Sequence, residues 1–346
     1  MARGISLIPE LTEIVVRGEV NNHFYNQHVD LSLVPSDGLL PGTIQYEVPE
    51  ITQNYNQHIG RNVTVQSSEI PQVGINYPDD RKVTIYGRTI PSDGYGIKLY
   101  NRDAYEYDKT MAHIRKMSRD ASRANGFLMR HDLAPSAASG KVMVTTGVSR
   151  SVTRASQLRS DTGNVNVHKV TLSDLTKLRT MIERDLEYDA AINNIYVSVP
   201  SVMWDDIEEI YRDSAYQQVN QQLLTTGFIR IMNGMTFIRM NEVIGYVTTG
   251  EGSSTTINSK VNIATRYTAV GIPDDTTTQR HVSAMWAFVP LSEFMVASAI
   301  EQEILDDQGR TPTTQSFNAS LYTRWIAGLT RTDKIGSYAL AYARHA

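Results

Sequence analysis

The hydrophobic positions between residues 107 and 128 recur at the spacing of an α-helix. Successive apolar side chains are four, three, three, four, three and four residues apart, which keeps them on one helical face. The members of this stripe are Tyr107, Met111, Ile114, Met117, Ala121, Ala124 and Leu128. The other sides of the helix carry a group of cations, namely Lys109, Arg115, Lys116, Arg119, Arg123 and Arg130. The pattern predicts one long helix with a buried stripe and a basic outer side.

The chain before this helix divides into a helical segment and a β-rich segment. A weaker helical pattern runs from Glu10 to Leu33, and the turn residues Val34–Gly38 close it. From Gly42 to Leu99 the pattern changes to period two, which predicts several strands. This β-rich segment has few large apolar residues to bury. We therefore expect it to protrude and to find its packing partners elsewhere, for example on a neighbouring copy.

The segments that follow the basic helix predict an α/β core. Residues 134–167 are polar and predict loops with a short hairpin. Thr171 and Asp174 have the spacing of a capping box, so a helix is expected to begin there. Its expected buried face consists of Leu172, Leu175, Leu178 and Ile182. A buried strand at 195–199 and a helix around 204–211 complete this core.

The last third of the chain predicts mostly strands. Asn233-Gly234 joins two apolar runs and is the dipeptide that best suits a tight hairpin turn. Residues 248–280 are polar and predict an exposed loop, whereas residues 293–305 suit a helix as well as a strand. Alternating apolar positions predict further strands, at Val282, Ala284, Trp286 and Phe288 and again at Leu321, Trp325, Ala339 and Ala341.

Composition narrows the classes of protein. The chain has 346 residues, a formal net charge of −4 and no cysteine, so disulfides, thiolate metal sites and cysteine nucleophiles are excluded. The first residues lack the apolar region of a signal peptide, and no run reaches the roughly 18 apolar residues of a membrane span. We expect a protein without membrane segments that is used in a cytoplasm-like space.

Motifs of catalysis and metal binding are missing from the sequence. The histidines form no H-E-x-x-H, and His23 and His28 do not share a helical face. Residues 135–142 resemble a phosphate-binding loop, but Pro135 and Val142 stand where its first glycine and its hydroxyl should be. Neighbouring acids such as Asp205-Asp206 point to different sides. We therefore expect no catalytic residue, no metal and no cofactor.

The basic helix has two interpretations. Clustered Lys and Arg neutralise DNA phosphates without reading the base sequence, which suggests a surface turned towards a polyanion. The alternative is an ordinary solvated face, and composition alone favours that alternative. The order of the segments along the chain favours the interpretation that this surface faces DNA.

That order resembles the major capsid protein of tailed bacteriophages, the Hong Kong 97-type fold. In that family an N-terminal arm precedes a long β-hairpin extension, the E-loop, then a long spine helix, a peripheral domain and an axial domain. Five segments match in order: Glu10–Leu33 looks like the arm, Gly42–Leu99 like the E-loop, Asp103–His131 like the spine helix, Thr171–Val199 like the peripheral domain and Gly227–Asn241 like the axial domain. The final strands, near residues 321–343, would return to the peripheral domain.

The resemblance implies an α+β fold whose parts can be assigned by residue. They are an N-terminal arm (1–41), an E-loop (42–100), a spine helix with a peripheral domain (101–199), an axial domain (200–285) and returning β-strands (286–346). The six cations of the spine helix would face DNA. Six charged residues of the E-loop would contact other subunits, namely Glu47, Arg61, Asp79, Arg81, Lys82 and Arg88.

The resemblance also implies a structural, non-enzymatic role. The chain would assemble into hexamers and pentamers of an icosahedral shell that encloses double-stranded DNA. Its expected partners are other copies of itself, the packaged DNA bound without sequence preference, and scaffolding, portal and decoration proteins, with no membrane. The expected location is the virion, after assembly in the host cytoplasm. The alternatives are another virion component, such as a tail-tube subunit, and an enzyme with an unrecognised site.

Overall fold

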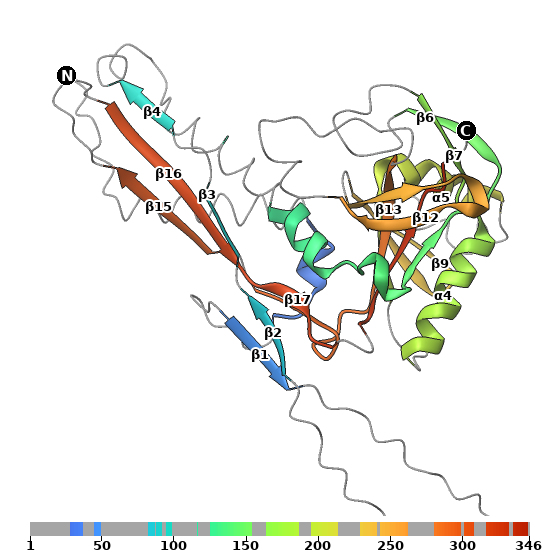
Figure 1. Ribbon diagram of the computed structural model, residues 1–346, viewed down its shortest axis with the longest axis horizontal. Coiled ribbons are helices and arrows are strands. Elements are labelled where there is room, and N and C mark those ends of the chain that lie inside the picture. The colour runs from blue at the N-terminus through green and yellow to red at the C-terminus, as the bar shows by residue number, and fades with distance from the viewer. Residues whose placement is uncertain are drawn as a thin grey trace, which may run out of the picture.

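Strands account for more of the described residues of the computed structural model than helices do (Figure 1). The structure describes residues 28–36, 45–49, 82–86, 88–91, 95–98, 116, 125–153, 164–186, 195–213, 229–240, 243–261, 280–298, 301–307, 316–331 and 335–344. These residues form a body, built of a large sheet with helices, and a long β-extension that leads away from it (Figure 1). Strands and helices are combined without a regular alternation, which confirms the α+β class.

An eight-stranded mixed sheet forms the centre of the body. Its strands are β5 (Val142–Val144), β8 (Ile195–Pro200), β9 (Ile229–Met232), β10 (Met235–Met240), β11 (Ile244–Thr249), β12 (Thr256–Lys260), β13 (Arg280–Phe288) and β18 (Ser337–Ala341). The order is β12-β11-β13-β8-β10-β9, with β18 pairing to β13 and to β5. The β8–β10 and β18–β5 pairs are parallel, and the other pairs in this sheet are antiparallel.

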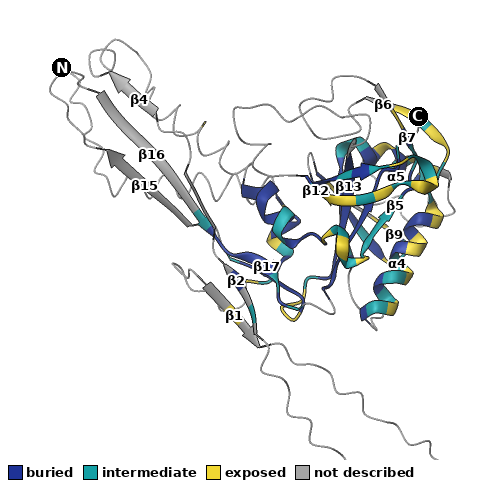
Figure 2. Ribbon diagram, in the orientation of Figure 1, coloured by how far each residue is buried: buried dark blue, intermediate teal, exposed yellow. Residues whose placement is uncertain are grey.

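Strand β13 lies at the centre of the core. It pairs with β11, β8 and β18, so its backbone has neighbours on both sides. Alternating apolar positions predicted this strand, and every residue from 282 to 289 is buried (Figure 2). Trp286 and Phe288 stack with ring centroids 4.1 Å apart. A strand covered on both faces needs a nearly continuous apolar run, and residues 282–289 supply one.

Two helices pack against this sheet. Helix α4 (Leu172–Leu186) contacts β18, and helix α5 (Ser201–Asp213) contacts β8, β10 and β13. The capping box at the start of α4 is confirmed, because Asp174 N donates to Thr171 Oγ1 at 3.2 Å and Thr171 N donates to Asp174 Oδ2 at 3.1 Å. Leu175, Leu178 and Ile182 are buried as predicted. Leu172 is an exception, since 39% of it is exposed.

Hairpins form where turn chemistry predicted them. Asn233 and Gly234 have φ values of 53° and 71°, the left-handed geometry that a tight turn between β9 and β10 requires. A second hairpin, β6 (Ser149–Thr153) with β7 (Asn164–His168), is the short hairpin expected within residues 134–167. The same stretch also holds a short 3₁₀ turn, η2 (Ala137–Ser139), and β5.

The β-extension combines strands from opposite ends of the sequence. Strand β16 (Ser316–Trp325) pairs along one edge with β15 (Glu301–Asp307). Along its other edge it pairs with β3 (Arg88–Pro91) and then β4 (Tyr95–Lys98). A separate antiparallel pair, β1 (Gln45–Pro49) with β2 (Lys82–Tyr86), lies near its base (Figure 1). The strands expected within 42–99 are therefore present where the structure describes that segment, and all four of them pair within the same chain.

A small apolar cluster joins the extension to the body. Strands β14 (Met295–Ala297) and β17 (Ala327–Leu329) pair there, and Ile85 of β2 packs with Val296 and Ile326. A Cβ atom on Gly328 would lie 2.7 Å from Ile85 Cγ2, closer than such atoms approach. The absence of a side chain at Gly328 therefore allows β2 to dock at this point.

Two predictions of local structure need correction, and one open alternative is decided. The described end of the helix predicted at 10–33 is a turn followed by the 3₁₀ helix η1 (Leu31–Leu33). Residues 293–305, which suited a helix as well as a strand, hold β14 and the start of β15 where the structure describes them. The described part of the predicted loop 248–280 holds the 3₁₀ turn η5 (Gly252–Ser254) and the edge strand β12, whose polar side chains suit an exposed edge.

The large sheet crosses two of the domain boundaries derived from the resemblance, those at 199/200 and 285/286. Strand β8 lies within 101–199 except for its last residue. Its partner β10 lies within 200–285, and its partner β13 runs from 200–285 into 286–346. The segments Thr171–Val199 and Gly227–Asn241 therefore contribute to one sheet. The division at residue 199 does not coincide with a boundary between sheets.

Replacing Thr171 with alanine tests the capping box. Thr171→Ala leaves the Asp174 N–H without its acceptor, so we expect a loss of about 1 kcal/mol in the free energy of unfolding. Thr180→Ala is the matched control, because the exposed Thr180 hydroxyl lies in the middle of α4 and only donates to the Thr176 carbonyl. The control should change stability by less than about 0.5 kcal/mol. Urea unfolding of the unassembled protein measures both, and equal losses would contradict the role of the cap.

Candidate assembly interface

The outer strands of the β-extension offer unpaired edges. Strand β15 pairs with β16 on one side only, and among the described residues no strand pairs with its other side. Exposed strand edges are the part of a sheet that most readily contacts another chain. Four of the seven residues of β15 are acidic, namely Glu301, Glu303, Asp306 and Asp307. Such charges discourage indiscriminate pairing while leaving the strand free for a specific neighbour.

The β1–β2 pair places two of the predicted contact residues on one hairpin. Glu47 of β1 is exposed, and Lys82 is the first residue of β2. Pro49 lies opposite Lys82 in the register, so residues 50–81 leave and re-enter the hairpin at adjacent positions. Arg88 lies elsewhere, on β3 opposite Trp325. The other predicted contact residues, Arg61, Asp79 and Arg81, fall outside the described residues.

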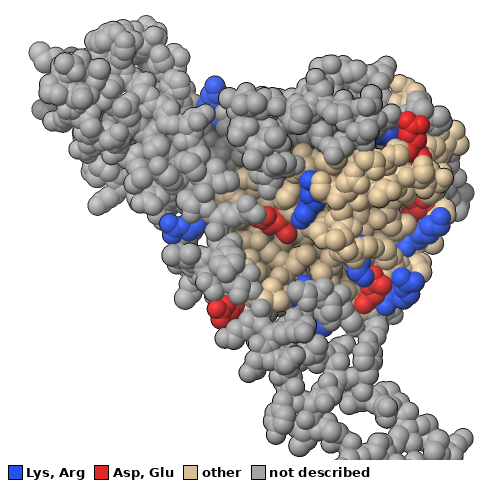
Figure 3. Space-filling model, in the orientation of Figure 1, with Lys and Arg blue, Asp and Glu red and all other residues tan. Residues whose placement is uncertain are grey.

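The predicted basic face is described at two of its six positions. Lys116 is helical and exposed, in keeping with an outward-facing cation. The predicted residues Lys109, Arg115, Arg119 and Arg123 fall outside the described residues. On the face of the molecule in Figure 3, acidic and basic side chains of the described residues lie interspersed, and no large area of one sign is visible.

Arg130 does not belong to an exposed face, so the prediction for this residue is wrong. Only 1% of its side chain is exposed, and its guanidinium holds the equally buried Asp30 through two hydrogen bonds. Nε donates to Asp30 Oδ2 at 2.6 Å and Nη2 donates to Asp30 Oδ1 at 2.6 Å. Charge-assisted pairs with this parallel geometry are among the stronger hydrogen bonds in proteins.

Two more side chains complete the buried polar cluster around Asp30. Ser198 of β8 donates to Asp30 Oδ2 at 2.7 Å, and His28 Nδ1 lies 3.0 Å from Arg130 Nη2. A guanidinium can only donate, so His28 accepts through Nδ1. Burial alone would raise the pKa of Asp30, but the charge and hydrogen bonds of Arg130 lower it below its ordinary value. The carboxylate is therefore ionised at neutral pH, and it connects the segment 28–36, the helix at 125–133 and the central sheet.

The signal for this cluster in the sequence is the apolar run next to Arg130. In the structure every residue from 125 to 130 is buried, so the helix is covered on all sides at this point. A cation inside an apolar run such as Phe127-Leu128-Met129-Arg130 has no solvated side to occupy. It needs a buried acid as a partner. Nothing local identifies Asp30 as that acid, because it lies 100 residues away in sequence.

The helix at 125–133 is also held at its C-terminal end. Lys260, the last residue of β12, donates through Nζ to the carbonyl oxygens of His131 at 2.6 Å and of Ala134 at 2.8 Å. A cation is favourable at this end of a helix, where carbonyl groups lack partners within the helix. Arg130 and Lys260 together fix how the helix leads into the body.

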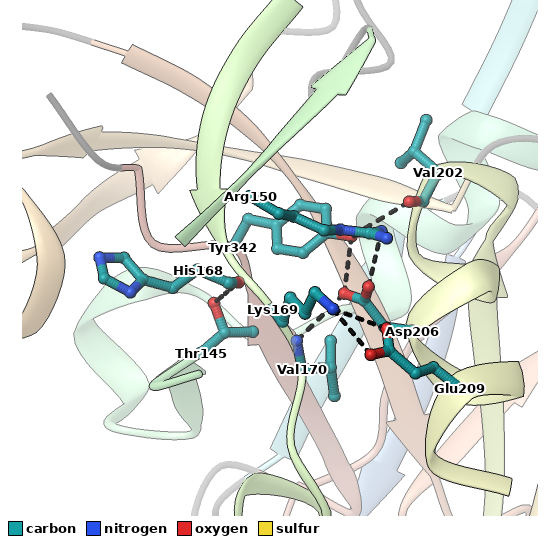
Figure 4. Close-up of polar contacts among 9 residues, drawn as sticks. All are labelled: Thr145, Arg150, His168, Lys169, Val170, Val202, Asp206, Glu209 and Tyr342. Atoms are coloured by element: carbon teal, nitrogen blue, oxygen red, sulfur yellow. Dashed lines mark hydrogen bonds and ion pairs between the residues drawn. The ribbon is translucent and has the colours of Figure 1, made fainter. Parts of the chain in front are cut away.

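A second polar cluster ties the C-terminal segment to α5 (Figure 4). The Arg150 guanidinium lies 2.6 Å from Asp206 Oδ1, and Tyr342 Oη lies 3.0 Å from Asp206 Oδ2. Val170 N donates to the same Oδ2 at 3.0 Å. Burial raises the pKa of Asp206, although the Val170 hydrogen bond and the charge of Arg150 act in the other direction. Arg150 Nε has no hydrogen-bond partner, but the Asp206 carboxylate and the Tyr342 hydroxyl are held by groups of the same chain, so the geometry indicates a structural role for this cluster.

The described residues offer neither a metal site nor a membrane-spanning helix. The described residues hold no group of three or more histidines and acids that could bind a metal ion. None of the helices in that part of the chain is both long and apolar enough to span a membrane.

Comparisons with known proteins identify the fold. No family model and no curated protein matches this sequence. Among solved structures, the chain is similar to the capsid of the cyanophage Pam1, with 8% identity, a TM-score of 0.52 and coverage of 87% of this chain and 85% of that one. The capsid of the cyanophage P-SCSP1u gives 12% identity, a TM-score of 0.50 and coverage of 91% and 87%. The capsid of an empty GTA particle gives 7% identity, a TM-score of 0.50 and coverage of 92% of this chain and 90% of that one. The chain therefore shares its fold, over nearly its full length, with chains of phage-type capsids.

The Asp30–Arg130 pair predicts a large loss of stability when one partner is removed. Arg130→Met keeps the length of the side chain but leaves the Asp30 carboxylate buried without its counter-charge. We expect a loss of about 3–5 kcal/mol in the free energy of unfolding, measured with urea on the unassembled protein. The double variant Asp30→Asn with Arg130→Met should recover part of that loss, because no charge is then left unpaired.

Lys116→Met is the matched control, since it removes a cation from the exposed part of the same basic sequence. It should change the free energy of unfolding by less than about 0.5 kcal/mol. Similar losses in Arg130→Met and Lys116→Met would contradict the structural role of Arg130.

Proposed function

We propose that the chain is the major capsid protein of a tailed bacteriophage, a non-enzymatic coat subunit that assembles into an icosahedral shell around double-stranded DNA. The observation that carries the proposal is the likeness in fold to three capsid chains, which covers 87–92% of this chain. Coverage of 85–90% of those chains means that the likeness is not confined to a common sheet motif.

The design of the subunit supports this function. A closed shell is stabilised by many repeated contacts, each of which can be weak. The β-extension provides long strand edges away from the body, and such edges can reach a neighbouring copy (Figure 1). A well-packed body suits a subunit that folds first and assembles afterwards.

The Hong Kong 97-type elements are assigned as part of the proposal. Residues 28–36 would belong to the N-terminal arm, the β1–β2 hairpin with residues 50–81 would form the E-loop, and residues 103–131 would form the spine helix. Strands β3, β4, β15 and β16 would belong to the peripheral domain, and the eight-stranded sheet with α4 and α5 to the axial domain. In this assignment Thr171–Val199 moves from the peripheral to the axial domain, because β8 lies in that sheet.

The proposed interface residues follow from the same assignment. Glu47, Arg61, Asp79, Arg81, Lys82 and Arg88 would contact other subunits in hexamers and pentamers. Five cations would face the packaged DNA without reading its sequence, namely Lys109, Arg115, Lys116, Arg119 and Arg123. Scaffolding, portal and decoration proteins are the further partners of such a shell. Its place would be the virion, after assembly in the host cytoplasm.

Electron microscopy of the purified protein tests the function directly. We expect closed icosahedral particles when the protein is concentrated, alone or together with a scaffolding protein. Tubes would instead support a tail-tube subunit. A small oligomer that persists under all assembly conditions would contradict both virion roles.

Replacing residues 50–81 with Asn-Gly tests the E-loop assignment. Pro49 and Lys82 are register partners, so a two-residue turn can close the β1–β2 hairpin without disturbing β3 and β4. The variant should remain folded, with a far-UV spectrum and urea midpoint close to those of the full chain, but it should not form particles. Particles of normal size from the shortened chain would show that residues 50–81 are not needed between subunits.

A further inference from the structure

Strand β5 forms an open edge of the large sheet. In the described part of the chain it pairs with β18 alone. The Lys141 carbonyl and the Thr145 N–H, on either side of β5, both bond to β18. Because backbone groups alternate in direction along a strand, the N–H and C=O groups of Val142 and Val144 point away from β18. Such an edge is a template for another extended segment.

An apolar hollow lies beside this edge, between β5 and α4. Its volume is about 370 Å³. The lining residues are Met143, Thr176, Lys177, Thr180, Met181 and Arg184. Met143 and Met181 are half-buried and pack against the core of the body. Methionine side chains are flexible and are common at surfaces that adapt to a partner, so this hollow can take an apolar side chain of a segment that adds to β5.

Positive charge prevails at the hollow. Lys177 and Arg184 are both exposed, and Lys177 forms no ion pair with any described residue. Arg184 Nη2 lies 3.7 Å from Asp185 Oδ1, but the Asp185 carboxylate is already held by Lys141. The Lys141–Asp185 pair is neutral, so Lys177 and Arg184 leave an excess of two positive charges.

The other acid in this part of α4 does not offset that excess. Glu183 pairs with Arg179, whose guanidinium also donates to the Asn233 carbonyl in the β9–β10 turn. This pair is neutral and is directed towards that turn. Positive charge beside an apolar hollow and an open strand edge therefore fits an acidic extended segment. DNA, by contrast, has no peptide groups with which to complete the strand edge.

The spacing of the two cations specifies the pattern of the segment. Lys177 and Arg184 are seven residues apart, which places them on one side of α4 and about 10.5 Å apart along its axis. Met181 lies between them. In an extended strand, side chains four residues apart share a face and are about 13 Å apart. The pattern acid-x-apolar-x-acid thus places its apolar residue at the hollow and its two acids within reach of the cations.

We propose that the β5 edge binds an acidic extended segment of another protein, which adds to the large sheet as a further strand. The apolar side chain of the segment enters the hollow between Met143 and Met181, and its acids pair with Lys177 and Arg184. Main-chain hydrogen bonds to β5 supply affinity, and the hollow with its cations supplies specificity. The inference does not depend on the shell function, because the edge belongs to the body of each single chain.

A synthetic peptide tests this edge directly. The probe is dye-labelled Thr-Glu-Thr-Leu-Thr-Glu-Thr, and its binding to the unassembled full chain is measured by fluorescence anisotropy. Lys177→Glu with Arg184→Glu should weaken binding by about tenfold or more, because acids then face acids. The matched control is Lys116→Glu with Arg239→Glu, which makes the same change of charge at two exposed cations outside the hollow. The control should bind the probe as the unchanged chain does.

Two methylated peptides test the backbone contacts. One carries N-methyl groups on its Glu and Leu residues and the other on its Thr residues, so each lacks the N–H donors of one edge. Only one edge of an added strand faces β5. One methylated peptide should therefore bind as the probe does, and the other should lose binding. Equal behaviour of the two peptides would overturn the addition of a strand.

The remaining outcomes separate this inference from the shell function. Particles formed by a chain that does not bind the probe would overturn the inference and leave the shell function intact. An equal loss of binding in the control variant would also overturn it. Binding by a chain that never forms particles would support the edge and count against the shell. Binding to the unassembled chain but not to particles would show that a second copy covers the edge, and would overturn an outside partner.

Discussion

The buried ion pair between Asp30 and Arg130 fixes how the parts of this subunit join. A buried charge is tolerated only with a counter-charge and further hydrogen bonds, and both are supplied here from distant parts of the chain. Asp30 comes from the N-terminal segment, Arg130 from the helix at 125–133 and Ser198 from the central sheet. None of the three segments can shift alone without leaving a charge unpaired. Lys260 adds a second restraint at the end of the same helix.

This arrangement separates the subunit into a part that holds its shape and a part that offers contacts. The body buries its aromatic residues between β13 and its neighbours, and its polar clusters have internal partners. The β-extension is attached to this body through Ile85, Val296 and Ile326.

Local sequence rules predicted the elements whose cause is local. The capping box at Thr171, the turn at Asn233-Gly234 and the strand at 195–200 depend on neighbouring residues and were predicted correctly. Pairings between distant segments were not predictable in the same way. The pairing of β3 and β4 with β16, the junction at Gly328 and the partner of Arg130 depend on residues far apart in sequence. Arg130 fits the spacing of the basic face, yet it is buried, because spacing along one helix carries no information about what covers it. The exposure of Leu172 was unforeseen for the same reason, since its spacing along α4 does not tell which neighbours cover it.

The pairing of β3 with β16 also sets the order of events during synthesis. Residues 88–91 pair with 322–325, so the first of these strands waits for its partner until more than two hundred further residues have been made. Contacts between such distant residues form late and slowly, because a long loop must close first. Until then the extension lacks its central strand. A chain that stops before β16 therefore cannot form the extension, whatever the state of its body.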